Sequence, residues 1–354
     1  MTQYASVSWD LAPARESEAL PRQRPRIVQP HEAERGNTVF GSPAYREIYD
    51  RRHVLSTEHG EQGCAPLLFD DRGDHAVCLA RTAALDEDAI IRTSETLFQL
   101  DRLRFLVFED VHLAAGGGRS FGSLRFRYQN DWVLPLGAGA GMAGSFCRRM
   151  DQKLRRLRRK HDGIELEIVP SPRRELVERA IRLSREKIEA GGTGYLIDDR
   201  EQDRLARLFR AIGTAAVLRH EDHVVSVDLF VEHGGEAYAF LGGYDASYAK
   251  ASPGLLTIRH GVEHFGRRGF QRVHFLWGDG AYKAELGAVR NPLSTLVVPR
   301  NAAAWRDGRF LAQAARFGLL DIKRRIKERS EIARPLHWAV KAPRHLATIL
   351  KARA

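Results

Sequence analysis

The sequence predicts an α/β protein, because strand patterns and helix patterns alternate along most of its 354 residues. Two further observations support this class. A strand, a helix and a second strand follow one another within residues 242–287. The chain also lacks a run of about 18 apolar residues, which a membrane-spanning helix would need. Its length and its 43% hydrophobic content fit roughly two domains with substantial cores.

The first half of the chain begins with an expected flexible leader. Residues 1–36 contain Pro21, Pro25 and Pro30 among charged and polar residues, without hydrophobic periodicity. Ordered structure is expected from about residue 40. The patterns predict a helix, a β-hairpin around a polar turn, a second helix and a strand. Their expected bounds are 45–52, 66–69 paired with 75–80, 89–100 and 104–108.

The second half predicts more helices and a longer series of strands. The expected helices span residues 147–160, 172–189 and 200–211. The expected strands span residues 164–169, 214–219, 223–232, 236–243 and 293–298. The strand at 236–243 begins the strand, helix, strand unit. Its helix is expected at 253–268 and its second strand at 272–277.

The start of the helix at 253–268 suits a phosphate-bearing ligand. Ser252 is expected to cap this helix, and Pro253 fits its first position because an amide hydrogen there would have no helical partner. Gly254 would let a ligand approach the backbone closely. Free amide groups at a helix N-terminus attract phosphate, so this turn predicts a binding site for the phosphates of an acyl donor.

Three segments together resemble the CelD-like branch of the GNAT superfamily of acyltransferases. They are the basic stretch 148–160 (RRMDQKLRRLRRK), the Ser-Pro-Gly turn 252–254 and the Gly-Asp-x-x-Tyr-Lys turn 278–283. The superfamily is related in fold to the FemAB and FemX peptidoglycan transferases. The resemblance covers residues 148–287.

This resemblance implies tandem GNAT-like halves, each a mixed, mainly antiparallel sheet flanked by helices. The implied boundaries are a leader at 1–36, an N-terminal half at 37–145, an acyltransferase half at 146–320 and a basic amphipathic tail at 321–354. The implied reaction moves an acyl group from acyl-CoA to an amine on an amino sugar, polysaccharide or lipid precursor, and acetyl-CoA is the expected donor. No metal is implied.

The same layout places the chemistry beside a pair of diverging strands, where acyl transfer needs a base, an acid and a polarised carbonyl. The expected catalytic residues are Asp279, Tyr282, Lys283 and Asp228. Asp279 or Asp228 would accept a proton, Tyr282 would return one, and Lys283 would meet a phosphate or a carbonyl. The donor is expected to contact Gly242, Gly243, Ser252, Pro253, Gly254 and Leu255, with the two adjacent glycines forming a bulge. The acceptor is expected to contact Tyr244, Asp245 and Tyr248.

Two motifs suggest other sites, and we expect neither to be functional. Residues 139–144 form a G-x-G-x-x-G pattern, but Pro135 interrupts the strand that a dinucleotide-binding fold would need. We interpret them as a linker. Residues 260–264 form an H-x-x-E-H pattern typical of zinc peptidases. On a helical wheel, His260 and His264 point away from the apolar face, which indicates solvated histidines.

Two other functions remain open. A FemAB-like transferase that uses aminoacyl-tRNA would have the same fold and would use the basic stretch 148–160, which holds eight Lys or Arg against one Asp. A non-catalytic scaffold in exopolysaccharide assembly is the alternative from another class. Aromatic residues for base stacking do not interleave with this basic stretch, so DNA is not an expected partner.

Charge and cysteine content bear on location. The net charge of +11 is concentrated at the C-terminus, where residues 322–354 hold ten Lys or Arg against two Glu. Such a tail favours an anionic surface, and its apolar residues suggest peripheral membrane contact. The three cysteines show no disulfide or zinc spacing. We therefore expect a cytoplasmic protein with peripheral contact at the inner membrane face.

Overall fold

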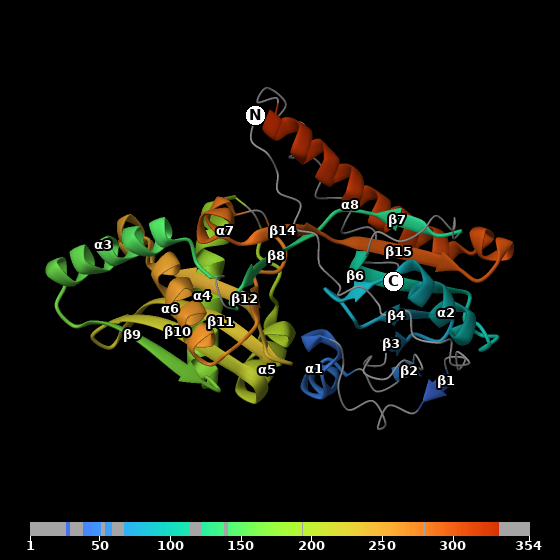
Figure 1. Ribbon diagram of the computed structural model, residues 1–354, viewed down its shortest axis with the longest axis horizontal. Coiled ribbons are helices and arrows are strands. Elements are labelled where there is room, and N and C mark those ends of the chain that lie inside the picture. Colours follow the sequence, from blue (N-terminus) through green and yellow to red (C-terminus); the bar gives the residue numbers. More distant parts are fainter. Residues whose placement is uncertain are drawn as a thin grey trace.

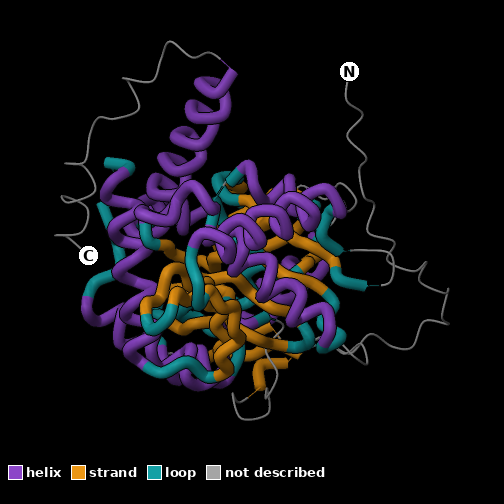
Figure 2. The backbone as a smooth tube through the Cα atoms, turned by 90° about the vertical axis from the view of Figure 1, so that its left-hand side faces the viewer, coloured by secondary structure: helices purple, strands orange, loops and turns teal. Residues whose placement is uncertain are grey.

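The computed structural model describes residues 26–28, 38–50, 54–58, 67–113, 122–137, 141–192, 194–278 and 280–332. These residues form two lobes side by side, each built on one sheet (Figure 1). Strands lie inside and helices outside, and one long helix projects from the body (Figure 2). The predicted α/β class, with two mixed sheets flanked by helices, is confirmed.

The first sheet has the strand order β1-β2-β3-β4-β6-β15-β7, with β5 paired to β6. Its strands are β1 (Arg26–Val28), β2 (Val54–Glu58), β3 (Leu67–Asp71), β4 (His75–Cys78), β5 (Ala84–Leu85), β6 (Phe105–Leu113), β7 (Leu124–Phe126) and β15 (Ser294–Pro299). α2 (Glu87–Leu97) packs on one face, and α8 (Gly308–Ile332) packs on the other through Phe310 and Phe317. β4 and β5 run parallel to β6, and the other pairs in this sheet are antiparallel.

The second sheet has the strand order β14-β8-β13-β12-β11-β10-β9. Its strands are β8 (Asn130–Pro135), β9 (Ile164–Pro170), β10 (Gly213–His220), β11 (His223–His233), β12 (Glu236–Tyr244), β13 (Arg272–His274) and β14 (Val289–Pro292). The pair β12–β13 is parallel, and the others are antiparallel. The sheet is therefore mainly antiparallel, as the resemblance implied.

Helices cover both faces of the second sheet. α3 (Gly144–Lys160) and α6 (Pro253–Arg267) share one apolar core with it, and α4 (Arg174–Ala190), α5 (Asp199–Ile212) and α1 (Pro43–Ile48) share the other. α7 (Ala281–Leu286) follows β13, and the 3₁₀ turns are η2 (Val39–Gly41), η3 (Ala246–Ala251) and η4 (Ala302–Arg306). α5 begins where Asp198 accepts the backbone N–H of Glu201 at 2.8 Å, and α6 is followed by Gly269 at φ +77°.

Strand pairing crosses the boundary predicted at residue 145. β8 precedes that boundary but lies in the second sheet, and β15 follows it but lies in the first sheet. α1 and η2 also precede it, yet Phe40 and Ile48 are buried in the second lobe. α8 runs without interruption across the predicted tail boundary at 320. The two sheets therefore each combine strands from both sides of residue 145, and the domain limits stay a prediction.

Both chain ends extend beyond the described residues. Within the predicted leader, Arg26–Val28 form β1, an extended segment that pairs with β2. Most of the predicted tail, including its apolar residues from 336 onward, lies outside the described part of the chain. In the described part, no helix combines the length and the apolar character that crossing a membrane requires.

Candidate active site

The second sheet opens between β12 and β13. The two strands pair only from Glu236–Tyr238 to Arg272–His274, whereas β12 continues to Tyr244 in contact with β11. One residue of β12, Phe240, is bulged out of the ladder with β11. The bulge predicted at Gly242 and Gly243 is therefore wrong in position, because both glycines pair in register with β11.

A cavity of about 470 Å³ fills this opening. This volume lies within the range of small-molecule sites, about 300–1,000 Å³. The lining comes from α4, β11, β12, the start of α6, the segment after β13, and α7. It comprises Lys187, Asp228, Ala239, Phe240, Leu241, Gly242, Gly243, Tyr244, Ala249, Ser252, Gly254, Leu255, Ile258, Phe275, Leu276, Trp277, Tyr282 and Lys283.

Asp228 is the buried carboxylate of this cavity, with only 7% of its surface exposed. It lies opposite Gly242, where a Cβ atom would come within 2.0 Å of its Oδ1, so only glycine fits there. The Thr257 hydroxyl donates a hydrogen bond to Oδ2. Burial raises the pKa of Asp228 to about 7, and neither this hydrogen bond nor the charge of Lys187 offsets the effect. A carboxyl with this pKa suits a proton acceptor near neutral pH.

Tyr282 lies on the first turn of α7 and lines the same cavity. Burial raises the pKa of its phenol above the ordinary range, and the nearby charge of Asp228 raises it further. The hydroxyl therefore carries its proton at neutral pH and is a possible proton donor. The cavity thus contains a proton acceptor and a proton donor close enough to interact electrostatically.

Lys283 holds the divergent segment in place. Its ammonium donates to the carbonyl oxygens of Phe275 (2.8 Å), Leu276 (3.3 Å), Trp277 (3.1 Å) and Gly278 (2.9 Å). Only 4% of the lysine is exposed, and Leu276 takes a left-handed conformation with φ 50°. The predicted strand to residue 277 therefore ends at His274, because the following carbonyls turn toward this cation instead of pairing with β12.

The start of α6 combines a helix terminus with a cation. Ser252 does not cap the helix as predicted. It takes a left-handed conformation (φ 55°), and its hydroxyl accepts a hydrogen bond from Lys153 of α3 at 2.7 Å. The N–H groups of Leu255 and Leu256 already reach the Ser252 carbonyl, at 3.0 and 3.3 Å. Attraction for phosphate at this end therefore comes from Lys153 and the helix terminus together.

Tyr244 lines the cavity beside Gly254 and Lys187. A Cβ atom on Gly254 would come within 3.3 Å of its ring, and the Lys187 ammonium lies 5.2 Å from the ring centroid. Gly243 faces α4, where a Cβ atom would come within 2.5 Å of the Ser184 nitrogen. The two glycines thus allow close packing, one against Asp228 and one against α4.

Several predicted site residues lie elsewhere. Asp245 accepts the N–H of Ser247 at 2.9 Å and lies 2.9 Å from His223, so it caps η3 outside the cavity. The Tyr248 hydroxyl lies 2.6 Å from Nδ1 of His220, beside the turn between β10 and β11. Pro253 begins α6 and is buried but does not line the cavity. Asp279 lies outside the described residues.

Sequence reasoning missed four contributors: Lys153, Lys187, Thr257 and Trp277. Lys153 is one of eight cations in its stretch, so nothing in the sequence distinguished it. Thr257 follows Pro253 by one helical turn, and this spacing was the only available signal. Lys187 and Trp277 enter the cavity through tertiary packing alone.

The two other motifs lie outside this cavity, and the prediction of solvated histidines does not hold in full. Gly141 and the residues up to α3 connect β8 to that helix, and residues 138–140 are not described. His260 and His264 are half-buried, and burial lowers the pKa of each imidazole. No group of three or more metal-ligating side chains occurs in the part of the chain that the structure covers.

Comparisons with known proteins agree with this geometry. The family profile described as "Acetyltransferase (GNAT) domain" matches residues 144–284. A search of curated proteins found no significant match. Among solved structures, FemX aligns over 77% of this chain and 97% of its own, with a TM-score of 0.54 at 10% identity. At that identity the likeness shows the fold alone.

Two other solved structures align more loosely and support no inference here. The C-terminal domain of a lysylphosphatidylglycerol synthetase from Agrobacterium fabrum covers 79% of this chain and 91% of its own, at 16% identity and a TM-score of 0.47. A tandem GNAT protein from the clavulanic acid pathway covers 70% and 83%, at 12% identity and a TM-score of 0.39. The assignment therefore rests on the match to the family profile. Domains of this class transfer acyl groups from acyl-CoA to amines. Residues 144–284 form a GNAT acetyltransferase domain, and the protein is an acyltransferase enzyme.

Proposed function

We propose that this protein transfers an acyl group, first of all acetyl, from acyl-CoA to an amine on an amino sugar, polysaccharide or lipid precursor, as in the CelD-like branch. The observation that carries the proposal is the cavity between β12 and β13, which is lined by Asp228 and Tyr282 and by Ser252, whose hydroxyl accepts a hydrogen bond from Lys153 of α3. A thioester with a diphosphate at its far end fits this distribution of charge.

The donor would enter along the opening, with its diphosphate near Lys153, Ser252 and the N-terminus of α6. Gly254 keeps that end open, because a side chain there would press against Tyr244. The thioester arm would lie beside the part of β12 that β13 leaves unpaired. Its backbone groups would orient the thioester carbonyl there.

The chemistry would then use two proton transfers. The acceptor amine attacks the thioester carbonyl while Asp228, directly or through water, takes a proton from its nitrogen. The C–N bond forms and the C–S bond breaks. Tyr282 gives its proton to the departing sulfur, so the products are an amide and free CoA. Lys283 has no direct part, because four carbonyls surround its ammonium.

Incubation with labelled acetyl-CoA and a panel of amino sugars, amines and lipid precursors tests the proposal. Asp228→Asn and Tyr282→Phe are each expected to lower transfer about 10²- to 10⁴-fold, the usual contribution of acid–base catalysis. Tyr248→Phe is the matched control, because that hydroxyl bonds to His220 outside the cavity. Equal activity of Tyr282→Phe and Tyr248→Phe would contradict the proposed proton donor.

A second candidate donor is aminoacyl-tRNA. Besides Lys153, α3 exposes seven cationic side chains: Arg148, Arg149, Arg155, Arg156, Arg158, Arg159 and Lys160. These cations lie on the same helix as the residue that contacts Ser252, so a polyanionic donor could lie along α3 into the cavity. Transfer from charged tRNA but not from acetyl-CoA, with loss on Arg155→Glu plus Arg159→Glu, would favour this candidate. A cytoplasmic location with peripheral membrane contact through residues 321–354 remains part of the proposal.

A further inference from the structure

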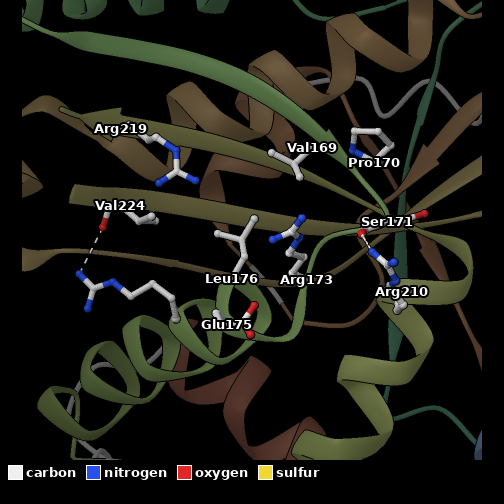
Figure 3. Close-up of a pocket in the computed structure, with 10 residues that line it drawn as sticks. Val169, Pro170, Ser171, Arg173, Glu175, Leu176, Arg210, Arg219 and Val224 are labelled. Carbon is white, nitrogen blue, oxygen red and sulfur yellow. Dashed lines mark hydrogen bonds between the residues drawn. The ribbon is translucent and has the colours of Figure 1, made fainter. Parts of the chain in front are cut away.

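A second cavity, of about 420 Å³, lies at the far edge of the second sheet from the β12–β13 opening. It is bounded by β9 and β10 and by the helices α4 and α5 (Figure 3). Four arginines line it: Arg173, Arg179, Arg210 and Arg219. The acidic residue in the lining is Glu175, so the charged side chains of this arginine pocket sum to three positive charges.

The floor of the arginine pocket is apolar. Val169 and Leu176 lie on opposite sides of it, and the guanidinium groups of Arg173 and Arg219 point toward the space between them (Figure 3). Val224 adds a third apolar side chain. These three residues are only partly buried, so the protein leaves apolar surface accessible between cations. That combination suits a ligand with an anionic head and a nonpolar body.

Hydrogen bonds and an ion pair hold three of the arginines in place. Arg179 donates to the Val224 carbonyl at 3.2 Å, and Arg210 donates to the Ser171 carbonyl at 3.2 Å. Arg219 donates through Nε to Glu167. Each of these bonds uses one nitrogen of a group that carries five N–H donors. The guanidinium groups are therefore held in position with donors to spare, which lowers the entropic cost of binding.

We propose that the arginine pocket binds an organic phosphate monoester with a short apolar body. One guanidinium is enough to pair with a single carboxylate. Against Glu175 and the Glu167 that pairs with Arg219, the four arginines keep a surplus of two positive charges, which matches a group with two negative charges and three acceptor oxygens. The apolar floor would cover the nonpolar part of the same molecule. The cavity volume lies within the usual range for such ligands, about 300–1,000 Å³.

The arginine pocket is separate from the acyl-transfer cavity. On α4, the nearest lining residues of the two cavities are Arg179 and Lys187, which lie eight residues apart, or about 12 Å along the helix at 1.5 Å per residue. The residues that line the two cavities do not overlap. The inference is therefore independent of the proposed function, and a ligand here would be an additional molecule or a remote part of an extended acceptor.

Calorimetric titration of the full chain with hexyl phosphate at 150 mM salt tests the proposal. We expect one site, with weaker binding of inorganic phosphate and hexanoate and no binding of hexanol. Arg173→Glu and Arg210→Glu are each expected to weaken the affinity about tenfold or more, as for loss of a charged hydrogen bond. Arg207→Glu is the matched control, since this exposed residue lies on α5 outside the pocket and changes the charge equally.

Equal weakening by Arg207→Glu would overturn the proposal, because it would reduce the effect to net charge. Loss of the titration when desulfo-CoA is present in excess would also overturn it, because the probe would then lie in the acyl-transfer cavity. Far-UV circular dichroism checks that the variants fold, and two independent arginine variants guard against a local failure. Sedimentation with phosphatidic acid vesicles then identifies the source of the phosphate. Co-sedimentation that Arg210→Glu abolishes indicates a lipid phosphate, and the absence of co-sedimentation indicates a soluble phosphate ester.

Discussion

The substitution Asp228→Asn is expected to stabilise the fold while removing the proposed proton acceptor. Burial raises the pKa of Asp228 to about 7, from an ordinary value of 3.8. A carboxyl with a raised folded-state pKa holds its proton more tightly in the native protein, so its ionisation costs stability. The cost begins above pH 3.8, grows as the pH rises, and is complete above pH 7.

The size of this effect follows from the two pKa values. Each pH unit between them corresponds to about 1.4 kcal/mol, so full ionisation costs at most about 4 kcal/mol. Asparagine is neutral at every pH, and its carbonyl oxygen can still accept the Thr257 hydroxyl. Between pH 5 and pH 8, the free energy of unfolding of Asp228→Asn should therefore rise relative to wild type by about 3 kcal/mol. Any pH-independent cost of the amide cancels in this difference.

Urea unfolding followed by circular dichroism at pH 5, 6, 7 and 8 measures the effect without any substrate. Asp222→Asn, at the exposed turn between β10 and β11, is the control that removes the same charge. Because this side chain is exposed, the comparison separates the effect of burial from that of net charge. A pH-independent difference for Asp228→Asn, or one that grows as the pH falls, would refute the reasoning, because Asp228 would then ionise like a solvated carboxyl.

Three further predictions concern the frame around the cavity. Lys283→Met leaves buried carbonyls without their donor and should lower the free energy of unfolding by about 1–3 kcal/mol in urea titrations, and an unchanged value would show that the ammonium is dispensable. Lys153→Ala should raise the KM for acyl-CoA about tenfold with little change in kcat, because the bound donor loses a charged contact. A fall in kcat alone would contradict the placement of Lys153 beside the donor's diphosphate. Burial alone would lower the pKa of His274, but hydrogen bonds to Asp131 and Glu236 raise it to about 9. The protonated imidazole therefore stabilises the folded protein below pH 6.5, and this contribution is lost as the pH rises through 9. Unfolding free energies between pH 7 and 9 should therefore fall more steeply in wild type than in His274→Gln, and parallel curves would rule this out.

The secondary structure was largely predictable because local patterns decide it. The helix expected at 253–268 and the strand expected at 236–243 agree with α6 and β12 to within one residue at each end, since apolar periodicity and flanking glycines mark both. The strand expected at 272–277 is too long. Its last residues satisfy their carbonyls through Lys283, a contact that no periodicity encodes.

The candidate site was only partly predictable. Asp228 and Tyr282 were identified and lie in one cavity, because strand alternation and the turn after β13 point to them. Tyr248 was misplaced, since η3 turns it toward His220 although it follows β12 closely in sequence. Lys187 approaches the site from the end of α4, which depends on how that helix packs against Gly243. Tertiary packing of this kind leaves no mark on the local sequence.

The most direct test of the account is a crystal structure of the protein with bound CoA. If the proposed function is correct, the diphosphate lies against Lys153 and the start of α6, and the arm occupies the opening between β12 and β13. The sulfur should then lie within hydrogen-bond reach of the Tyr282 hydroxyl. CoA bound anywhere else would contradict the proposed function.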